Sequence, residues 1–375
     1  MTAKVGMMMA KTIAYEEVAN MMNEWYGLIK KRKVDESIEL KEKIKRMLPH
    51  MEQNQDLLLY FNLLDFRNNL LIDDAQRLKI KSRTTVKLED IQKTDDMIQY
   101  YFYFFNGQFE FHNKNYIDAI NFYKIAEDKL KKIPDEIEHA EFHYKIAVAY
   151  YQIFQNFFSM SHAEKALNSF KSNEQYTYRQ MNSELLLALN KVDLLRYKEA
   201  DQHYENIIKK AQETGDFYTK SLAHHNIGIS YEKRGDLLQA ESHLLKAIDI
   251  PEHRESTNII RTYYMLSKVC FKSEKTDKAL VWYKKAWNLV EENNEDEYRA
   301  KLMILDALYN NSHINNIHHA MKYLEKKRLW TDIAELSREI GNHLKNKGNI
   351  TQAVKYYEHA LTAKDELIKM TEALE

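Results

Sequence analysis

Apolar residues recur every three or four positions along most of this chain, which is the spacing of one face of an α-helix. Between Ser221 and Ile250 the sequence SLAHHNIGISYEKRGDLLQAESHLLKAIDI divides at Gly235 and Asp236 into two such stretches. Gly228 in the first stretch and Ala240 in the second lie where two antiparallel helices would touch, because small side chains let backbones come close. The segment therefore predicts a pair of packed antiparallel helices.

An alanine-like position marks further copies of this helix pair. Each copy has a small residue twelve positions earlier and an apolar residue seven positions later. The marked positions are Ala119, Ser159, Ala200, Ala240, Ala279 and Ala353. They are 39 to 41 residues apart up to Ala279, and the last step of 74 leaves room for a degenerate copy around Leu302 to Lys327. The spacing predicts about seven helix pairs in a tetratricopeptide-repeat array, which stack into a superhelix with a concave inner wall.

Three further stretches with helical spacing precede the repeats. Thr12 can cap the first of them, and the second extends from Val34 to Leu48, where Pro49 ends it. The third begins near Asn54 to Asp56, and either of these residues can cap it. Their similar lengths predict a separate three-helix bundle over residues 1–73, so that the whole protein has an all-α fold.

The periodic pattern stops between the bundle and the repeats. Residues 74–96 are rich in charge and contain the β-branched run Thr84-Thr85-Val86, which predicts a linker or hinge. The repeat domain then extends over residues 97–375 and opens with the aromatic run MIQYYFYFFNGQFEF. We expect this aromatic face to form a core against the bundle, because aromatic side chains bury large apolar areas.

Composition narrows the possible partners. The 8 Gly, 3 Pro and 44% hydrophobic residues favour a helical chain with few loops, and the formal net charge of −1 leaves no basic field for a phosphate backbone. We therefore expect no direct nucleic-acid partner. The single Cys270 cannot form an internal disulfide and suits a reducing compartment. Because no apolar run is long enough to span a bilayer, we expect a cytoplasmic protein with no membrane partner.

The sequence gives little support for a metal site or for a cofactor of the protein's own. It has no Gly-rich phosphate loop, no HExxH motif and no cluster of cysteine and histidine with zinc spacing. His139 and His143 share one helix face, but no third ligand accompanies them. The nearby Glu138 and Glu141 are interpreted equally well as surface charges.

Five strings, taken in order, resemble the Rap family of Gram-positive bacilli. They are NEWYGLIKKRKVDESIELKEKI, MEQNQDLLLYFNLLDFR, YYFYFFNGQFEF, DEIEHAEFHYKIAVAYYQIFQNFFSMSHAEKAL and NIGISYEKRGD. The resemblance covers nearly the whole chain and implies a quorum-sensing regulator that is controlled by a short, re-imported signalling peptide. It leaves two activities open, which are dephosphorylation of a response regulator and non-enzymatic sequestration of a DNA-binding response regulator. A generic tetratricopeptide adaptor is a third alternative.

The resemblance also implies which residues act on the response regulator. In phosphatase members the glutamine of the M-E-x-x-Q-D string is the inserted residue, and here MEQNQD places it at Gln55. A glutamine amide both donates and accepts hydrogen bonds, so it can hold a water in line with the acyl phosphate, whereas Mg²⁺ would belong to the regulator. The further partner-binding candidates are Gln53, Asn54 and Phe66. Gln53 stands where the family is often acidic, and Phe66 also belongs to an apolar stripe for which core packing is the first interpretation.

The second candidate site is the concave wall, which the first helix of each pair is expected to form. The resemblance implies an aspartate in the third repeat and an asparagine in the fourth as peptide anchors, and these are Asp193 and Asn226 here. The neighbouring peptide-binding candidates on the wall are Tyr151, Asn182, His225 and Tyr264. Taken singly, each is explained equally well as a polar residue tolerated in a wet groove. We expect bound peptide to draw the bundle onto the array about the hinge.

Overall fold

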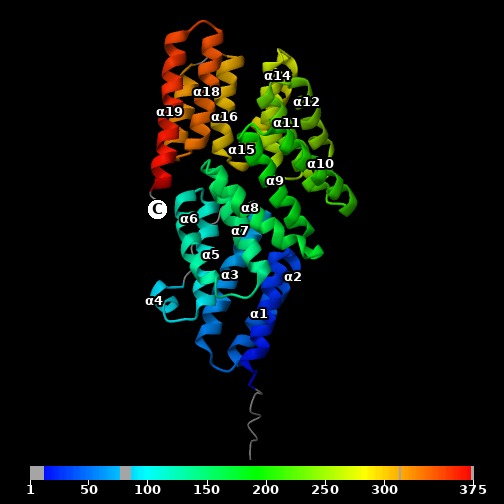
Figure 1. The fold of residues 1–375 in the computed structure, drawn as a ribbon, viewed down its shortest axis with the longest axis vertical. Coiled ribbons are helices and arrows are strands. Elements are labelled where there is room, and N and C mark those ends of the chain that lie inside the picture. Colours follow the sequence, from blue (N-terminus) through cyan, green and yellow to red (C-terminus); the bar gives the residue numbers. More distant parts are fainter. Residues whose placement is uncertain (1–11, 77–85, 312–313, 373–375) are drawn as a thin grey trace, which may run out of the picture. The chain divides into compact units, whose positions relative to one another are not determined.

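The computed structural model describes residues 12–76, 86–311 and 314–372, which form a succession of α-helices (Figure 1). The predicted all-α fold is confirmed. The chain divides into two compact units, whose border lies between Phe142 and His143 within one helix. Each unit is described by itself. None of the helices in the described ranges is long and apolar enough to cross a membrane.

The first unit contains a three-helix bundle and the first helix pair of the array. Its helices are α1 (Tyr15–Lys30), α2 (Val34–Met47), α3 (Gln55–Gln76), α4 (Leu88–Ile91), α5 (Asp96–His112), α6 (Tyr116–Leu130) and the beginning of α7 (Glu136–Gln152). The three predicted helices are confirmed, and Asn54 Oδ1 caps α3 by accepting from Leu57 N–H at 3.0 Å. Within the predicted hinge, α3 ends and α4 forms, and residues 77–85 lie outside the described ranges.

The start of α1 differs from the prediction. Thr12 does not cap this helix, which begins at Tyr15 without a side-chain cap. Instead, Ile13 pairs with the segment that follows α2, because its N–H donates to the His50 carbonyl and its carbonyl accepts from Glu52 N–H, both at 2.9 Å. An extended pairing therefore satisfies the backbone of Ile13, which the prediction placed inside the helix.

The aromatic face of α5 forms the core of the first unit. Tyr101 packs against Tyr26 of α1 and Tyr60 of α3, with ring centroids 5.2 and 5.5 Å apart. Phe66 of α3 lies 6.0 Å from Phe109 of α5, and its side chain is buried. The expected core between α5 and the bundle is confirmed. Phe66 is part of this core, so in this structure it is not an exposed wedge for a partner.

A buried carboxylate joins α1 to helices α5 and α7. Glu138 is fully buried, and its Oε1 accepts hydrogen bonds from the hydroxyls of Tyr26 at 2.9 Å and Tyr100 at 2.8 Å. Lys30 Nζ lies 3.3 Å from Oε2 of the same side chain. Burial raises the pKa of Glu138, against the opposing effects of Lys30 and the two hydroxyls. Glu141 is buried too, so the interpretation of these two residues as surface charges is wrong.

The second unit continues the array from α7. Its pairs are α7 with α8 (Asn156–Lys171), α9 (Thr177–Asp193) with α10 (Tyr197–Thr214), α11 (Phe217–Arg234) with α12 (Leu237–Asp249), α14 (Asn258–Lys272) with α15 (Thr276–Asn293), α16 (Asp296–Tyr309) with α17 (Ile314–Lys326), and α18 (Trp330–Asn346) with α19 (Ile350–Glu372). The short α13 (Pro251–Arg254) precedes α14. Together with α5 and α6, the described helices make the predicted seven pairs. The degenerate copy is α16 with α17.

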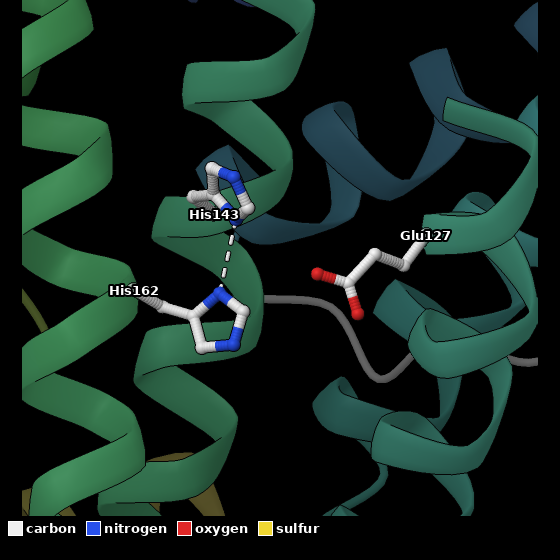
Figure 2. A group of neighbouring side chains, drawn as sticks. All are labelled: Glu127, His143 and His162. Carbon is white, nitrogen blue, oxygen red and sulfur yellow. Dashed lines mark hydrogen bonds between the residues drawn. The ribbon is translucent and has the colours of Figure 1, made fainter. Parts of the chain in front are cut away.

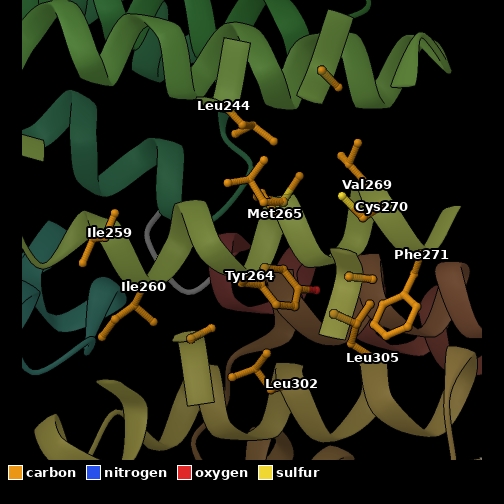
Figure 3. Close-up of a cluster of buried hydrophobic side chains, with 14 of the residues drawn as sticks. Leu244, Ile259, Ile260, Tyr264, Met265, Val269, Cys270, Phe271, Leu302 and Leu305 are labelled. Carbon is orange, nitrogen blue, oxygen red and sulfur yellow. The ribbon is translucent and has the colours of Figure 1, made fainter. Parts of the chain in front are cut away.

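Apolar side chains from successive pairs interlock between the helices of the second unit. Figure 3 shows Leu244 of α12, Met265 and Cys270 of α14 and Leu302 of α16 in one cluster, in which all four side chains are buried. Because each pair covers the apolar face of the next, no pair is stable without its neighbours. Cys270 is a free, buried thiol in this cluster.

Gly228 lies at a close helix contact of the fourth pair, α11 with α12, where an added side chain would clash. A Cβ added there would lie 2.6 Å from Leu244 Cγ and 3.2 Å from the Ala240 carbonyl oxygen. Gly228→Ala is therefore expected to lower the free energy of unfolding by about 1–3 kcal/mol, as overpacking does. Gly27→Ala is the matched control, because nothing lies within 4 Å of its added Cβ. Urea denaturation measures both, and equal stabilities for the two variants would contradict the expected clash.

Candidate functional site

The first helices of six successive pairs line one groove in the second unit. Helices α7, α9, α11, α14, α16 and α18 all contribute side chains, and the enclosed space measures about 1020 Å³. The prediction that first helices form the concave wall is confirmed for these pairs. The volume is at the upper end of the range for small-molecule sites.

All six residues that the sequence analysis placed on the wall line this groove. They are Tyr151, Asn182, Asp193, His225, Asn226 and Tyr264. Three of them, Asn182, His225 and Tyr264, have most of their surface covered by neighbours. The structure thus brings the candidates together around one space, although they come from four helices.

The contribution of α18 to the groove was not predicted from the sequence. Asp332, Glu335 and Glu339 of this helix line the groove as well. Their spacing of three and four residues places them on one helix face. The acidic face can be recognised in the sequence. No sequence pattern, however, indicated that α18 would line the same groove as the earlier pairs. The hydroxyl of Thr331, at the start of α18, donates to the Gln152 carbonyl at the end of α7, at 2.8 Å.

Asp193 lies at the centre of a polar cluster in the groove. Lys233 Nζ donates to its Oδ1 at 2.6 Å, and the Tyr151 hydroxyl also hydrogen-bonds its carboxylate. Burial raises the pKa of Asp193, and Lys233 opposes this effect. Burial alone would lower the pKa of Lys233, but the charges of Glu335 and Asp193 outweigh burial and raise it. Lys233 is therefore protonated at neutral pH.

A second ionic cluster ties α11 and α14 to α18. Lys268 Nζ lies 2.8 Å from Glu339 and 3.3 Å from Glu232, and Lys272 lies 2.6 Å from Glu232. Burial would raise the pKa of Glu232, but Lys268 and Lys272 outweigh it and lower the pKa to about 2. Lys301 of α16 adds a third tie, at 2.8 Å from Asp332. Lys268, Lys272 and Lys301 thus form ion pairs with the acidic face of α18, in which Lys272 is 3.7 Å from Glu339.

His225 belongs to a buried chain of hydrogen-bonding groups. Its Nδ1 lies 2.8 Å from Thr262 Oγ1, which is 2.7 Å from His253 Nε2, and His253 Nδ1 is 2.9 Å from Ser221 Oγ. Burial, followed by His253 and Arg261, lowers the pKa of His225 to about 3. The imidazole is therefore neutral at physiological pH and faces the groove as a hydrogen-bonding group without charge.

The two other histidines singled out in the sequence, His139 and His143, have partners of different kinds. Figure 2 shows His143 of α7 and His162 of α8, whose Nδ1 atoms share a hydrogen bond at 3.0 Å. The same contact recurs in the fourth pair between His224 and His243 at 3.2 Å. His139 Nε2 instead lies 2.8 Å from the Ile133 carbonyl oxygen. His139 and His143 therefore do not face a common ligand position in this structure.

Three of the four candidates for contact with a response regulator lie around the start of α3 in the first unit, whereas the fourth, Phe66, lies in the core. Gln55 is the first residue of α3, and its side chain is exposed, as is that of Gln53. Asn54 between them is half-buried because its Oδ1 caps the helix. The cap fixes the backbone that presents Gln55, so the amide extends into solvent from a rigid helix start.

Relatives of known description match nearly the whole chain. Residues 12–73 match the family model described as response regulator aspartate phosphatase H, N terminal, and residues 221–292 and 338–366 match tetratricopeptide-repeat models. Response regulator aspartate phosphatase I of Bacillus subtilis (strain 168) is 31% identical, over 95% of this chain and 93% of its own length. Regulatory protein RapK of the same organism is 32% identical, over 95% and 97%. The crystal structure of a Rap protein complexed with Competence and Sporulation Factor has 33% identity and a TM-score of 0.89, over 95% of this chain and 99% of that one.

Proposed function

This chain belongs to the Rap family, and we propose that it is a peptide-controlled phosphatase of a response regulator. Gln55 is its catalytic residue. The observation that carries the proposal is the exposed amide of Gln55 at the capped start of α3, within the segment that matches the phosphatase model. The relatives named as response regulator aspartate phosphatases support the same substrate class.

The reaction needs few groups from this protein. Water attacks the phosphorus of the aspartyl-phosphate, the P–O bond to the aspartate breaks, and phosphate leaves as the carboxylate is restored. The Gln55 amide accepts from the attacking water and orients it in line with the breaking bond. Mg²⁺, which would neutralise the phosphoryl oxygens, would belong to the response regulator and not to this protein. The positive end of the α3 dipole lies beside Gln55 and favours the developing negative charge.

Gln55→Ala tests this proposal. The change removes a positioning group from an exposed site, so we expect the dephosphorylation rate to fall by about 10²-fold while stability changes by about 0.5 kcal/mol or less. The measurement is loss of label from phosphorylated candidate regulators. Asn69→Ala is the matched control, since Asn69 is also exposed and lies on the same helix, fourteen residues further along. Normal turnover by Gln55→Ala would refute the catalytic role.

Sequestration of a DNA-binding response regulator is the second candidate function. It is favoured by Gln53, which stands where the resemblance leads us to expect an acidic residue, and by the relative that is named a regulatory protein. The same assay separates the two functions. A wild-type protein that binds a regulator and blocks its DNA binding, but releases no phosphate from any regulator, would establish sequestration instead.

The groove is the proposed site of the controlling peptide. Its volume, its polar lining and the Rap protein structure that is complexed with Competence and Sporulation Factor support this assignment. Asp193 and Asn226 would anchor the peptide, with Tyr151, Asn182, His225 and Tyr264 as further contacts. Asn226 suits a peptide backbone because its amide donates and accepts at once.

A further inference from the structure

Four side chains form a buried row of hydrogen bonds behind the wall of the groove. The row begins at His225, which lines the groove, and continues through Thr262 and His253 to Ser221. The last three are fully buried, and His225 is 6% exposed. Burial lowers the pKa of His225 to about 3 and that of His253 to about 4, so each ring carries one N–H at neutral pH. One nitrogen of each ring therefore donates and the other accepts.

The serine end of the buried row sets the order of its protons. Ser221 Oγ lies 2.6 Å from the Tyr218 carbonyl oxygen, which can only accept, and 2.9 Å from His253 Nδ1. When the hydroxyl donates to this carbonyl, His253 Nδ1 carries the proton and donates to Ser221. His253 Nε2 then accepts from the Thr262 hydroxyl at 2.7 Å. Because Thr262 has given its proton away, its oxygen accepts from His225 Nδ1–H at 2.8 Å.

The reverse order makes one hydrogen bond fewer. In that order Ser221 donates to His253, His253 to Thr262 and Thr262 to His225, so the backbone carbonyl beyond Ser221 loses its hydroxyl donor. Thr262 Oγ1 also lies 3.2 Å from the Asn258 carbonyl oxygen. Donation there would leave His253 Nε2 as a buried acceptor without a donor, which is costly. The geometry therefore favours the first order, in which both rings carry the proton on Nδ1.

We propose that the buried row holds His225 Nε2 as a hydrogen-bond acceptor toward the groove, where it takes an N–H of the ligand. Within the part of the chain that the structure describes, nothing hydrogen-bonds to Nε2, and this atom keeps contact with solvent. The inference rests on the proposed peptide ligand and assigns a backbone N–H to this position, since every peptide residue except proline carries one. Ser221 does not line the groove and is a positioning residue, because it acts through the row.

The tautomers of the two rings are observed directly in the full-length protein. In protein labelled with ¹⁵N at histidine, protonated and bare ring nitrogens differ in chemical shift, and His225→Gln and His253→Gln assign the two rings. We expect Nδ1 to be protonated in both. A proton on Nε2 of His225 in the wild-type protein overturns the proposal. This measurement needs neither a peptide nor a response regulator.

Two variants test whether the buried row sets the tautomer of His225. Ser221→Ala removes the acceptor of His253 Nδ1–H, so the row should reverse and the proton of His225 should move to Nε2. Thr262→Val removes the link, so His225 should again carry the proton on Nε2, which solvent reaches, whereas His253 should keep it on Nδ1. Ser230→Ala is the control, because it removes a buried hydroxyl of the same helix outside the row. A proton that stays on Nδ1 of His225 in either Ser221→Ala or Thr262→Val overturns the role of the row.

The ligand assignment is tested with mixed pentapeptide libraries in which one backbone amide at a time is replaced by an ester. The ester keeps the shape and loses the N–H. Binding is measured as the concentration dependence of the melting temperature. One replacement should weaken binding to the wild-type protein and to Ser230→Ala about tenfold, as loss of one hydrogen bond predicts, and should leave binding to Ser221→Ala unchanged.

Equal binding of the amide and ester libraries by the wild-type protein at every position overturns the assigned N–H. The same loss in Ser221→Ala as in Ser230→Ala also overturns it. Failure of every library to bind refutes the peptide site and the ligand of Nε2 together, whereas the tautomers are decided by the NMR measurement alone. The phosphatase proposal is tested separately, since no response regulator is present.

Discussion

Glu138→Ala is expected to lower the free energy of unfolding of the first unit by about 3–5 kcal/mol. The substitution leaves the buried hydroxyls of Tyr26 and Tyr100 without their acceptor, and an unsatisfied buried hydroxyl costs about 1–3 kcal/mol. It also empties the space of a fully buried side chain, which adds the cost of a cavity. Lys30 is affected less, because it keeps Asp135 at 3.3 Å.

Glu138→Gln and Glu136→Ala are the controls for this prediction. Glutamine keeps the oxygen that accepts from both tyrosines, so it should lose about 1–2 kcal/mol at most. Glu136 is exposed on the same helix, and its loss should change stability by about 0.5 kcal/mol or less. Hydrogen exchange in α1 and α5 reports the first unit separately from the second. Protection in Glu138→Ala equal to that in Glu136→Ala would contradict the structural role of the carboxylate.

The raised pKa of Glu138 gives this comparison a pH dependence with a definite sign. A carboxyl group whose folded pKa is raised stabilises the protein in its protonated form, and that contribution is lost as the pH rises through the folded pKa. The wild-type protein should therefore lose stability relative to Glu138→Gln as the pH rises from below about 4.3, the ordinary pKa of glutamate. Urea denaturation of both proteins over this range measures the difference. An opposite trend would mean that the effect of Lys30 on the pKa of Glu138 outweighs the effect of burial.

The repeats were predictable from the sequence because each pair repeats one local rule. A small residue is needed wherever two helices cross closely, and Gly228 beside Ala240 satisfies that rule within a short stretch of chain. The degenerate pair around Leu302 was predicted only from the 74-residue step between Ala279 and Ala353. The candidates on the wall were predictable for the same reason, since each first helix presents an equivalent face. Local periodicity was therefore enough to predict both the helices and the helix faces that line the groove.

Long-range polar contacts were not predictable in this way. Glu138 lies in a charged string, DEIEHAE, that has the composition of a solvated helix start, and its burial depends on Tyr26, which is 112 residues away. The acidic face of α18 has the same ambiguity, because Glu335 and Glu339 resemble ordinary surface charges until Lys233 and Lys268 are brought opposite them. The burial of Glu138 and the pairing of the acidic face of α18 both depend on contacts between distant segments, which a local sequence pattern does not show.

Lys268→Ala is expected to lower the stability of the second unit by about 3–5 kcal/mol, the usual result of removing one partner from a buried ion pair. The Lys268 side chain is only 14% exposed, as is that of Glu339, and that of Glu232 is 7% exposed. Without Lys268, two nearly buried carboxylates share Lys272, which is 3.7 Å from Glu339. Thermal denaturation of the full-length protein measures this loss. Lys278→Ala, at an exposed side chain, is the control.

The double variant Lys268→Met with Glu339→Leu distinguishes a lost charge balance from lost packing. Replacing both partners by apolar side chains of similar size removes the uncompensated charge, so much of the stability should return. The pH dependence offers a second check, because Glu232 has a pKa depressed to about 2. Its stabilising contribution is present above the ordinary pKa of about 4.3 and is lost as the pH falls toward 2. The difference between the wild-type protein and Lys268→Ala should therefore shrink over that window, and a constant difference would show that Lys268 acts through packing alone.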